Sequence, residues 1–136
     1  MICYWDKLDS PIGSIYLAAT HEGLVYCASS RANGMEMNSW LNKYLPEYII
    51  KEGSNTILDE AKVQLKEYFS GKRKILNVPL KPIGTDFRKT VWEALCTIPY
   101  GETRTYGEIA AQIGNPRGPR AVGQANHNNP ISYFIP

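Results

Sequence analysis

The amino-acid sequence lacks the features that mark several large classes of protein. Its 136 residues include three cysteines, an odd number at no metal-like spacing. That count argues against a disulfide framework and is typical of free thiols in a reducing cytoplasm. No apolar run approaches the ~18 residues of a membrane span, and Asp6 interrupts the start too early for a signal peptide. We therefore expect a protein of the cytoplasm or nucleoid that makes no membrane contact.

A strong charge of either sign is also missing. The 15 Lys and Arg residues against 13 Asp and Glu residues give a net charge of +2, too small to indicate a nucleic-acid partner by itself. Any basic contact surface has to be local. His21 and Cys27 are the one pair that resembles metal ligands, and they do not form a zinc-binding pattern. We predict no bound metal and no cofactor.

The N-terminal part shows mainly the patterns of strands and turns. Polar and apolar residues alternate over 15–19, and a tight connection at 21–23 leads into the apolar run 24–28, which indicates a hairpin. Apolar residues at helical spacing predict a helix from Ile57 to Phe69. Further strands are expected at 2–5, 48–50 and 75–80, and a helix at 35–44. These elements predict an α/β domain with a small antiparallel sheet over residues 1–82.

Residues 83–136 read as helical. Thr85 can cap a helix that ends near residues 97–99. Thr105 and Glu108 form the sequence pattern of a capping box, which starts a second short helix. Gly114, followed by Asn and Pro at 115–116, ends that helix, and a third begins at residues 118–119. Two short helices around a tight turn predict a helix-turn-helix, of the winged kind, in a C-terminal domain.

The last of these helices has an unusual composition for a reader of DNA bases. It carries one cation, Arg120, and small residues at Ala121, Gly123 and Ala125, whereas major-groove readers usually carry several Arg, Asn and Gln residues. Small side chains allow a backbone to approach the floor of a narrow minor groove. They also allow two helices to pack closely, and the pattern alone does not decide between these interpretations.

The C-terminal stretch resembles the C-terminal domain of O6-alkylguanine-DNA alkyltransferases, also called methylated-DNA–protein-cysteine methyltransferases. The matching residues are Phe87, Val91, Trp92, Ile98 to Thr103, Thr105 to Ala110, Gly114 to Pro116, Arg120 to Gly123, Ala125, Asn126, Asn129 and Pro130. The resemblance implies a DNA repair protein that binds duplex DNA through the minor groove, flips the damaged guanine outward and transfers its alkyl group to a cysteine. It implies no obligate protein partner.

The same resemblance implies roles for individual residues. Arg120 would fill the space that the flipped guanine leaves, and Tyr106 would crowd the phosphate and donate a hydrogen bond to the guanine ring. Ala121 and Gly123 would face the minor groove, and Asn129 would brace the turn before the nucleophile. From the residues alone, Arg120 could equally be a surface cation, and Tyr106 a core tyrosine.

The family's acceptor cysteine follows the proline that corresponds to Pro136, the last residue of this sequence. We therefore expect the chain as given to contain no catalytic nucleophile and to transfer no alkyl group. A non-catalytic lesion-binding module and a degenerate remnant are the alternatives. We also expect Ile131, Tyr133, Phe134 and Ile135 to be left uncovered, so that the C-terminus unfolds or associates with another copy.

Overall fold

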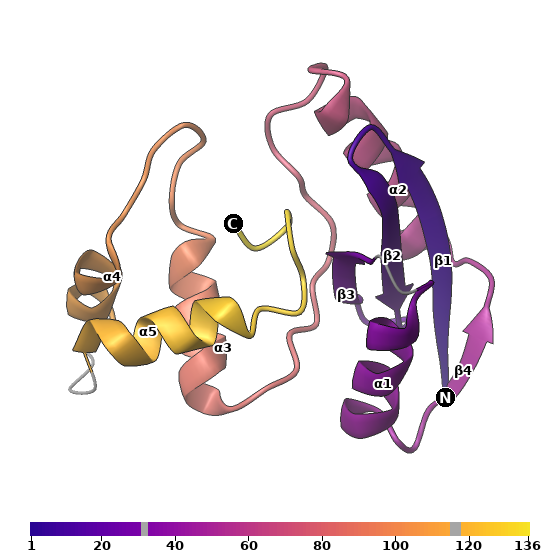
Figure 1. Cartoon of the computed structure of the whole chain (residues 1–136), viewed down its shortest axis with the longest axis horizontal. Coiled ribbons are helices and arrows are strands. Elements are labelled where there is room, and N and C mark those ends of the chain that lie inside the picture. Colours follow the sequence, from indigo (N-terminus) through magenta and orange to yellow (C-terminus); the bar gives the residue numbers. More distant parts are fainter. Residues whose placement is uncertain (31–32, 115–117) are drawn as a thin grey trace.

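The computed structural model describes residues 1–30, 33–114 and 118–136. Its N-terminal lobe is built on a four-stranded sheet with the strand order β3-β2-β1-β4 (Figure 1). The strands are β1 (Ile2–Ser10), β2 (Gly13–Ala19), β3 (Leu24–Ser29) and β4 (Ile49–Glu52). The predicted hairpin between β2 and β3 is confirmed. The expectation of a purely antiparallel sheet is wrong, because β4 pairs with β1 in parallel. The chain reaches β4 through helix α1 (Met35–Tyr44), the kind of crossover that parallel pairing requires.

Helices cover both faces of the sheet, so the inner strand β2 is buried on each side. Tyr16 and Ala18 of β2 belong to the apolar cluster beneath α1, while Ile15 and Leu17 belong to the cluster beneath α2 (Thr56–Phe69). The period of two sends alternate side chains to opposite faces. The alternation in the sequence therefore marks two cores rather than one buried and one exposed face.

The strand predicted at residues 75–80 is wrong. This segment runs as an extended connection with a single bridge between Leu80 and Leu24. The side chain of Gln64 on α2 satisfies the backbone of Asn77, accepting from its N–H at 2.7 Å and donating to its carbonyl at 2.9 Å. The Gln64 side chain thus makes the hydrogen bonds that a neighbouring strand would make. Pro79 also disfavours a strand here, because proline has no N–H to donate to a neighbouring strand.

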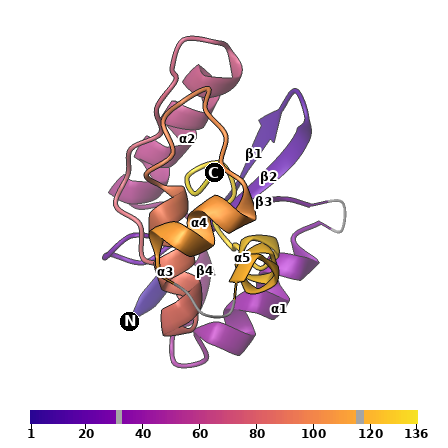
Figure 2. The same ribbon diagram turned by 90° about the vertical axis from the view of Figure 1, so that its left-hand side faces the viewer.

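The C-terminal lobe contains α3 (Asp86–Leu95), α4 (Tyr106–Gln112) and α5 (Gly118–His127). The predicted caps at Thr85 and Thr105 are confirmed, the second as a complete capping box with Glu108. Gly114 has a φ of 62°, as predicted for a left-handed helix end; the predicted turn residues 115–116 lie outside the described residues. Helix α4 lies on the side of this lobe that faces away from the sheet, and α5, seen nearly end-on in Figure 2, runs from that side toward the sheet.

The expectation of an uncovered C-terminus is wrong. Ile131, Phe134 and Ile135 are 0%, 6% and 1% exposed and belong to the same cluster as the sheet and helix α3. The backbone of Cys27 in β3 donates to the Pro130 carbonyl and accepts from Ser132. A free edge of β3 thus receives this segment. Because one apolar cluster joins side chains from both predicted domains, the division at residues 82/83 stays a prediction.

Candidate nucleic-acid interface

The exposed aromatic residue Tyr106 opens helix α4 and rests against helix α5. A Cβ atom added to Gly123 would lie 3.1 Å and 3.2 Å from two carbons of the Tyr106 ring, so a larger residue there would push the ring away by a few tenths of an ångström. Tyr106 is 46% exposed, which makes it a surface residue rather than a core tyrosine. The absence of a side chain at Gly123 allows α4 and α5 to pack closely, and this packing positions the exposed Tyr106 ring.

Arg120 lies beside this ring. It is exposed in the first turn of α5 and, with Tyr106, Pro119, Gly123, Gln124 and His127, lines a hollow of about 520 Å³. Neither Arg120 nor His127 has a hydrogen bond or ion pair with a side chain of the described residues. A free guanidinium next to an aromatic ring can stack on bases and bind phosphate oxygens. Ala121, also predicted for this surface, is half-buried on the same helix.

Asn129 holds the chain that follows α5. Its side-chain oxygen accepts from the N–H of Ile131 at 2.9 Å, and its amide nitrogen donates to the carbonyl of Ile135 at 2.8 Å. These two bonds fold residues 129–135 into a compact turn next to Pro136. This geometry fits the predicted bracing of the segment before the nucleophile, and the part that Asn129 has in alkyl transfer stays a prediction.

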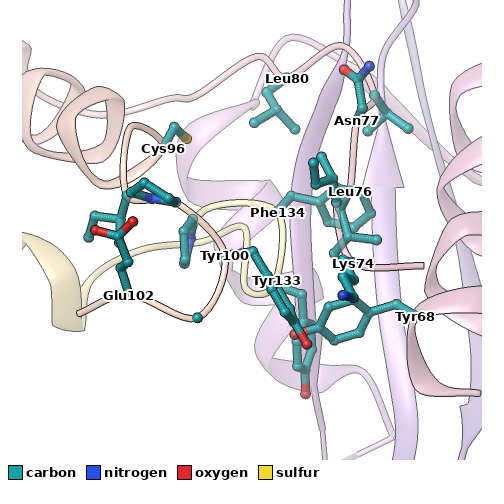
Figure 3. A pocket seen from close by; sticks show the side chains of 16 residues that line it. Tyr68, Lys74, Leu76, Asn77, Leu80, Cys96, Tyr100, Glu102, Tyr133 and Phe134 are labelled. Carbon is teal, nitrogen blue, oxygen red and sulfur yellow. The ribbon is translucent and has the colours of Figure 1, made fainter. Parts of the chain in front are cut away.

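A second cleft lies between the lobes (Figure 3). It has a volume of about 460 Å³, and Pro136 lies on its wall. Lys74 and Leu76 of the connecting segment line one side, and Cys96, Tyr100 and Glu102 line the other, with Tyr133 and Phe134 between them. The Lys74 ammonium lies 5.7 Å from the centre of the Tyr100 ring. The cleft thus combines apolar side chains with the charged groups of Lys74 and Glu102.

The three cysteines differ in their surroundings. Cys3 and Cys27 are fully buried, and burial raises the pKa of the Cys3 thiol to about 11 and that of Cys27 further. Cys96 is exposed at the end of α3. Burial of its sulfur and the nearby carboxylate of Glu93 raise its pKa too. Thiols with raised pKa values hold little thiolate at neutral pH and are poor nucleophiles.

Metal binding finds no support in the described residues. They contain no group of three or more His, Cys, Asp or Glu side chains placed to hold an ion. Cys27 is fully buried whereas the His21 side chain is 75% exposed. None of the described helices combines the length and the apolar character needed to cross a bilayer.

Asn126 is a further residue of this interface, and the sequence predicted no role for it. Its amide nitrogen lies 3.2 Å from the Tyr106 hydroxyl oxygen. The contact joins residues twenty positions apart on two helices, so no local pattern announces it. Its place in the matching motif was the one signal that could have drawn attention to it.

Comparisons with known proteins cover the whole chain. The family model described as "6-O-methylguanine DNA methyltransferase, ribonuclease-like domain" matches residues 3–82, and the model of the same family's "DNA binding domain" matches residues 86–136. A methylated-DNA–protein-cysteine methyltransferase of Methanosarcina barkeri is 45% identical over 135 residues, which span 98% of this chain and 78% of that protein.

Solved structures agree with these matches. The crystal structure of the Mycobacterium tuberculosis O6-methylguanine methyltransferase has a TM-score of 0.82 at 38% identity, covering 99% of this chain and 76% of that one. A structure of M. tuberculosis OGT in complex with DNA has a TM-score of 0.77 at 39% identity, covering 98% and 74%. Together with the exposed Arg120 and Tyr106 on the helix-turn-helix, these matches show that the chain belongs to the 6-O-methylguanine DNA methyltransferase family.

Proposed function

We propose that this protein repairs alkylated DNA by the reaction after which its relatives are named, the transfer of a methyl group from DNA to a protein cysteine. The observation that carries the proposal is that Arg120 and Tyr106, from the two helices of the helix-turn-helix, line the same exposed hollow. Both side chains are exposed, and an exposed cation beside an aromatic ring suits contact with a nucleic acid. The site of action would be the DNA of the cytoplasm or nucleoid.

The composition of α5 supports binding through the minor groove. Ala121 and Gly123 keep the helix surface low beside Arg120, so the backbone can come close to a narrow groove. Arg120 would enter the duplex and take the place of the extruded guanine. Extrusion costs a few kcal/mol in lost stacking and pairing, and a planar guanidinium stacked on the neighbouring bases offsets part of this cost.

The transfer itself is a displacement at the alkyl carbon. A thiolate sulfur forms a bond to that carbon while the bond from carbon to guanine O6 breaks, and the electron pair stays on the guanine. Tyr106 would donate a hydrogen bond to the guanine ring as it leaves. By the family resemblance, the acceptor cysteine comes directly after the position of Pro136, and Asn129 and the buried Ile135 would hold this part of the chain in place.

The experiment compares Arg120→Ala with the unchanged chain on two fluorescent duplexes. One contains a single O6-methylguanine and the other is undamaged. We expect the variant to lose more affinity for the damaged duplex, because Arg120 acts on the flipped state, whereas backbone phosphate contacts are common to both. Lys72→Ala, which removes one exposed positive charge from the N-terminal lobe, is the control. Equal losses on both duplexes would refute the intercalating role of Arg120.

A further inference from the structure

We propose that Asn126 is a positioning residue that fixes the Tyr106 hydroxyl as a hydrogen-bond donor to DNA. The inference rests on the proposed function and adds to it, because the family resemblance gave Asn126 no role. It concerns the direction of one hydrogen bond. The amide of Asn126 would decide which partner receives the phenolic hydrogen.

Helix α5 holds Tyr106 at two points. The backbone of Gly123 supports the ring, since a Cβ atom there would come within 3.1 Å of it. Asn126 is three residues further along, on the same face of the helix, and its amide nitrogen lies 3.2 Å from the hydroxyl oxygen. One contact fixes the plane of the ring and the other reaches its polar tip.

The chemistry of the amide gives this contact a direction. An amide nitrogen has hydrogens to donate and no lone pair to offer, so the Tyr106 oxygen is the acceptor. The hydrogen of the phenol is then left for another group. In the part of the chain that the structure describes, no acceptor contacts it, and Tyr106 is 46% exposed beside Arg120 in the hollow. A hydroxyl that accepts one bond also becomes a stronger donor, because linked hydrogen bonds polarise one another.

The partner that fits this arrangement is a hydrogen-bond acceptor on the nucleic acid. Phosphate oxygens and the acceptor atoms of an extruded guanine share this chemistry, and the inference covers both. Without Asn126 the ring would still rest on Gly123, but the hydroxyl would be free to turn and donate to water. The loss should therefore appear in DNA binding and be transmitted entirely through the Tyr106 oxygen.

A double-mutant cycle tests this dependence. The affinity of the 136-residue chain for a fluorescein-labelled duplex with one O6-methylguanine is measured by anisotropy for Asn126→Ala, Tyr106→Phe and the combined variant. We expect Asn126→Ala to weaken binding by roughly three- to tenfold, the range of one hydrogen bond. In the Tyr106→Phe background, the same substitution should change the affinity by less than about twofold. Equal effects in the two backgrounds would overturn the inference.

A second test reverses the direction of the hydrogen bond between Asn126 and Tyr106. Asn126→Asp is nearly isosteric, but its carboxylate can only accept, so it would draw the phenolic hydrogen away from DNA. We expect it to weaken binding more than Asn126→Ala does. The control is Asn128→Asp, which places the same charge two residues further on, at an exposed position whose side chain donates to the Gln124 carbonyl. Equal losses in the two Asp variants would show charge repulsion alone and would also overturn the inference.

The controls separate this inference from the proposed function. Thermal melts identify any variant that has lost its fold, and if Asn126→Ala has, the nearly isosteric Asn126→Asp carries the test. If the unchanged chain does not prefer the damaged duplex, the proposed function fails and the inference fails with it. If that preference is present and the cycle is additive, the proposed function stands and the role of Asn126 alone is refuted.

Discussion

The substitution Ile135→Ala tests whether the C-terminal apolar segment holds the two lobes together. Ile135 is 1% exposed and belongs to the cluster that includes Leu17 of the sheet and Trp92 of α3. Its carbonyl also accepts from Asn129, a bond that alanine keeps because the backbone is unchanged. The substitution therefore removes side-chain burial and little else.

The size of the effect follows from the burial of the side chain. Isoleucine has three more carbons than alanine, which at about 0.8 kcal/mol for each buried carbon gives about 2.4 kcal/mol. The cavity left behind adds to this, and measured values for such substitutions run from about 2 to 5 kcal/mol. We expect a loss of about 3 kcal/mol in the free energy of unfolding, a large share of the ~5–15 kcal/mol of a typical domain.

Urea unfolding followed by tryptophan fluorescence measures this loss. Trp5 and Trp40 report on the N-terminal lobe and Trp92 on the C-terminal lobe, and a shared cluster should give one transition. Ile12→Ala is the control, because Ile12 lies in a turn at 56% exposure and should change the unfolding free energy by less than about 0.5 kcal/mol. A similarly small change for Ile135→Ala, or separate transitions for the two lobes, would refute the reasoning.

Three further predictions concern the binding site, a helix cap and the cysteines. Gly123→Ala should raise the stability of α5 by up to about 1 kcal/mol and yet weaken binding to the damaged duplex, because its Cβ would displace the Tyr106 ring; thermal melts and anisotropy measure the two effects, and unchanged binding would contradict the packing argument. The hydrogen bond from the Thr105 backbone lowers the pKa of Glu108 below its ordinary value, so the capping carboxylate stabilises α4 at pH values above the pKa of the unfolded chain and loses this effect as pH falls through the folded pKa. The stability difference between the unchanged chain and Glu108→Gln should accordingly shrink in acid, and a constant difference from pH 3 to pH 7 would argue against it. Finally, incubation of the 136-residue chain with a duplex carrying labelled O6-methylguanine should leave Cys3, Cys27 and Cys96 unlabelled, because burial raises the pKa of each thiol; stoichiometric label on any of them would disprove this.

The sequence by itself determined the elements whose cause is local. Thr85 and Thr105 start helices because the side-chain oxygen reaches a backbone N–H three residues away. Gly114 ends one because glycine takes a positive φ at little cost. The position of Arg120 in the first turn of α5 followed from the same kind of local signal, whereas its role in the candidate interface came from the family resemblance.

Only the tertiary structure decided where partners far apart in the chain meet. Residues 75–80 have the composition of a strand, but the Gln64 side chain satisfies the backbone of Asn77 in their middle, and no local pattern contains that contact. The segment 131–135 looked uncovered because its partners, the edge of β3 and the helices of the cluster, lie far back in the sequence. The hydrogen bond from Asn126 to Tyr106 likewise exists only because α4 and α5 pack together. Local chemistry fixes where elements begin and end, while long-range packing fixes which groups face one another.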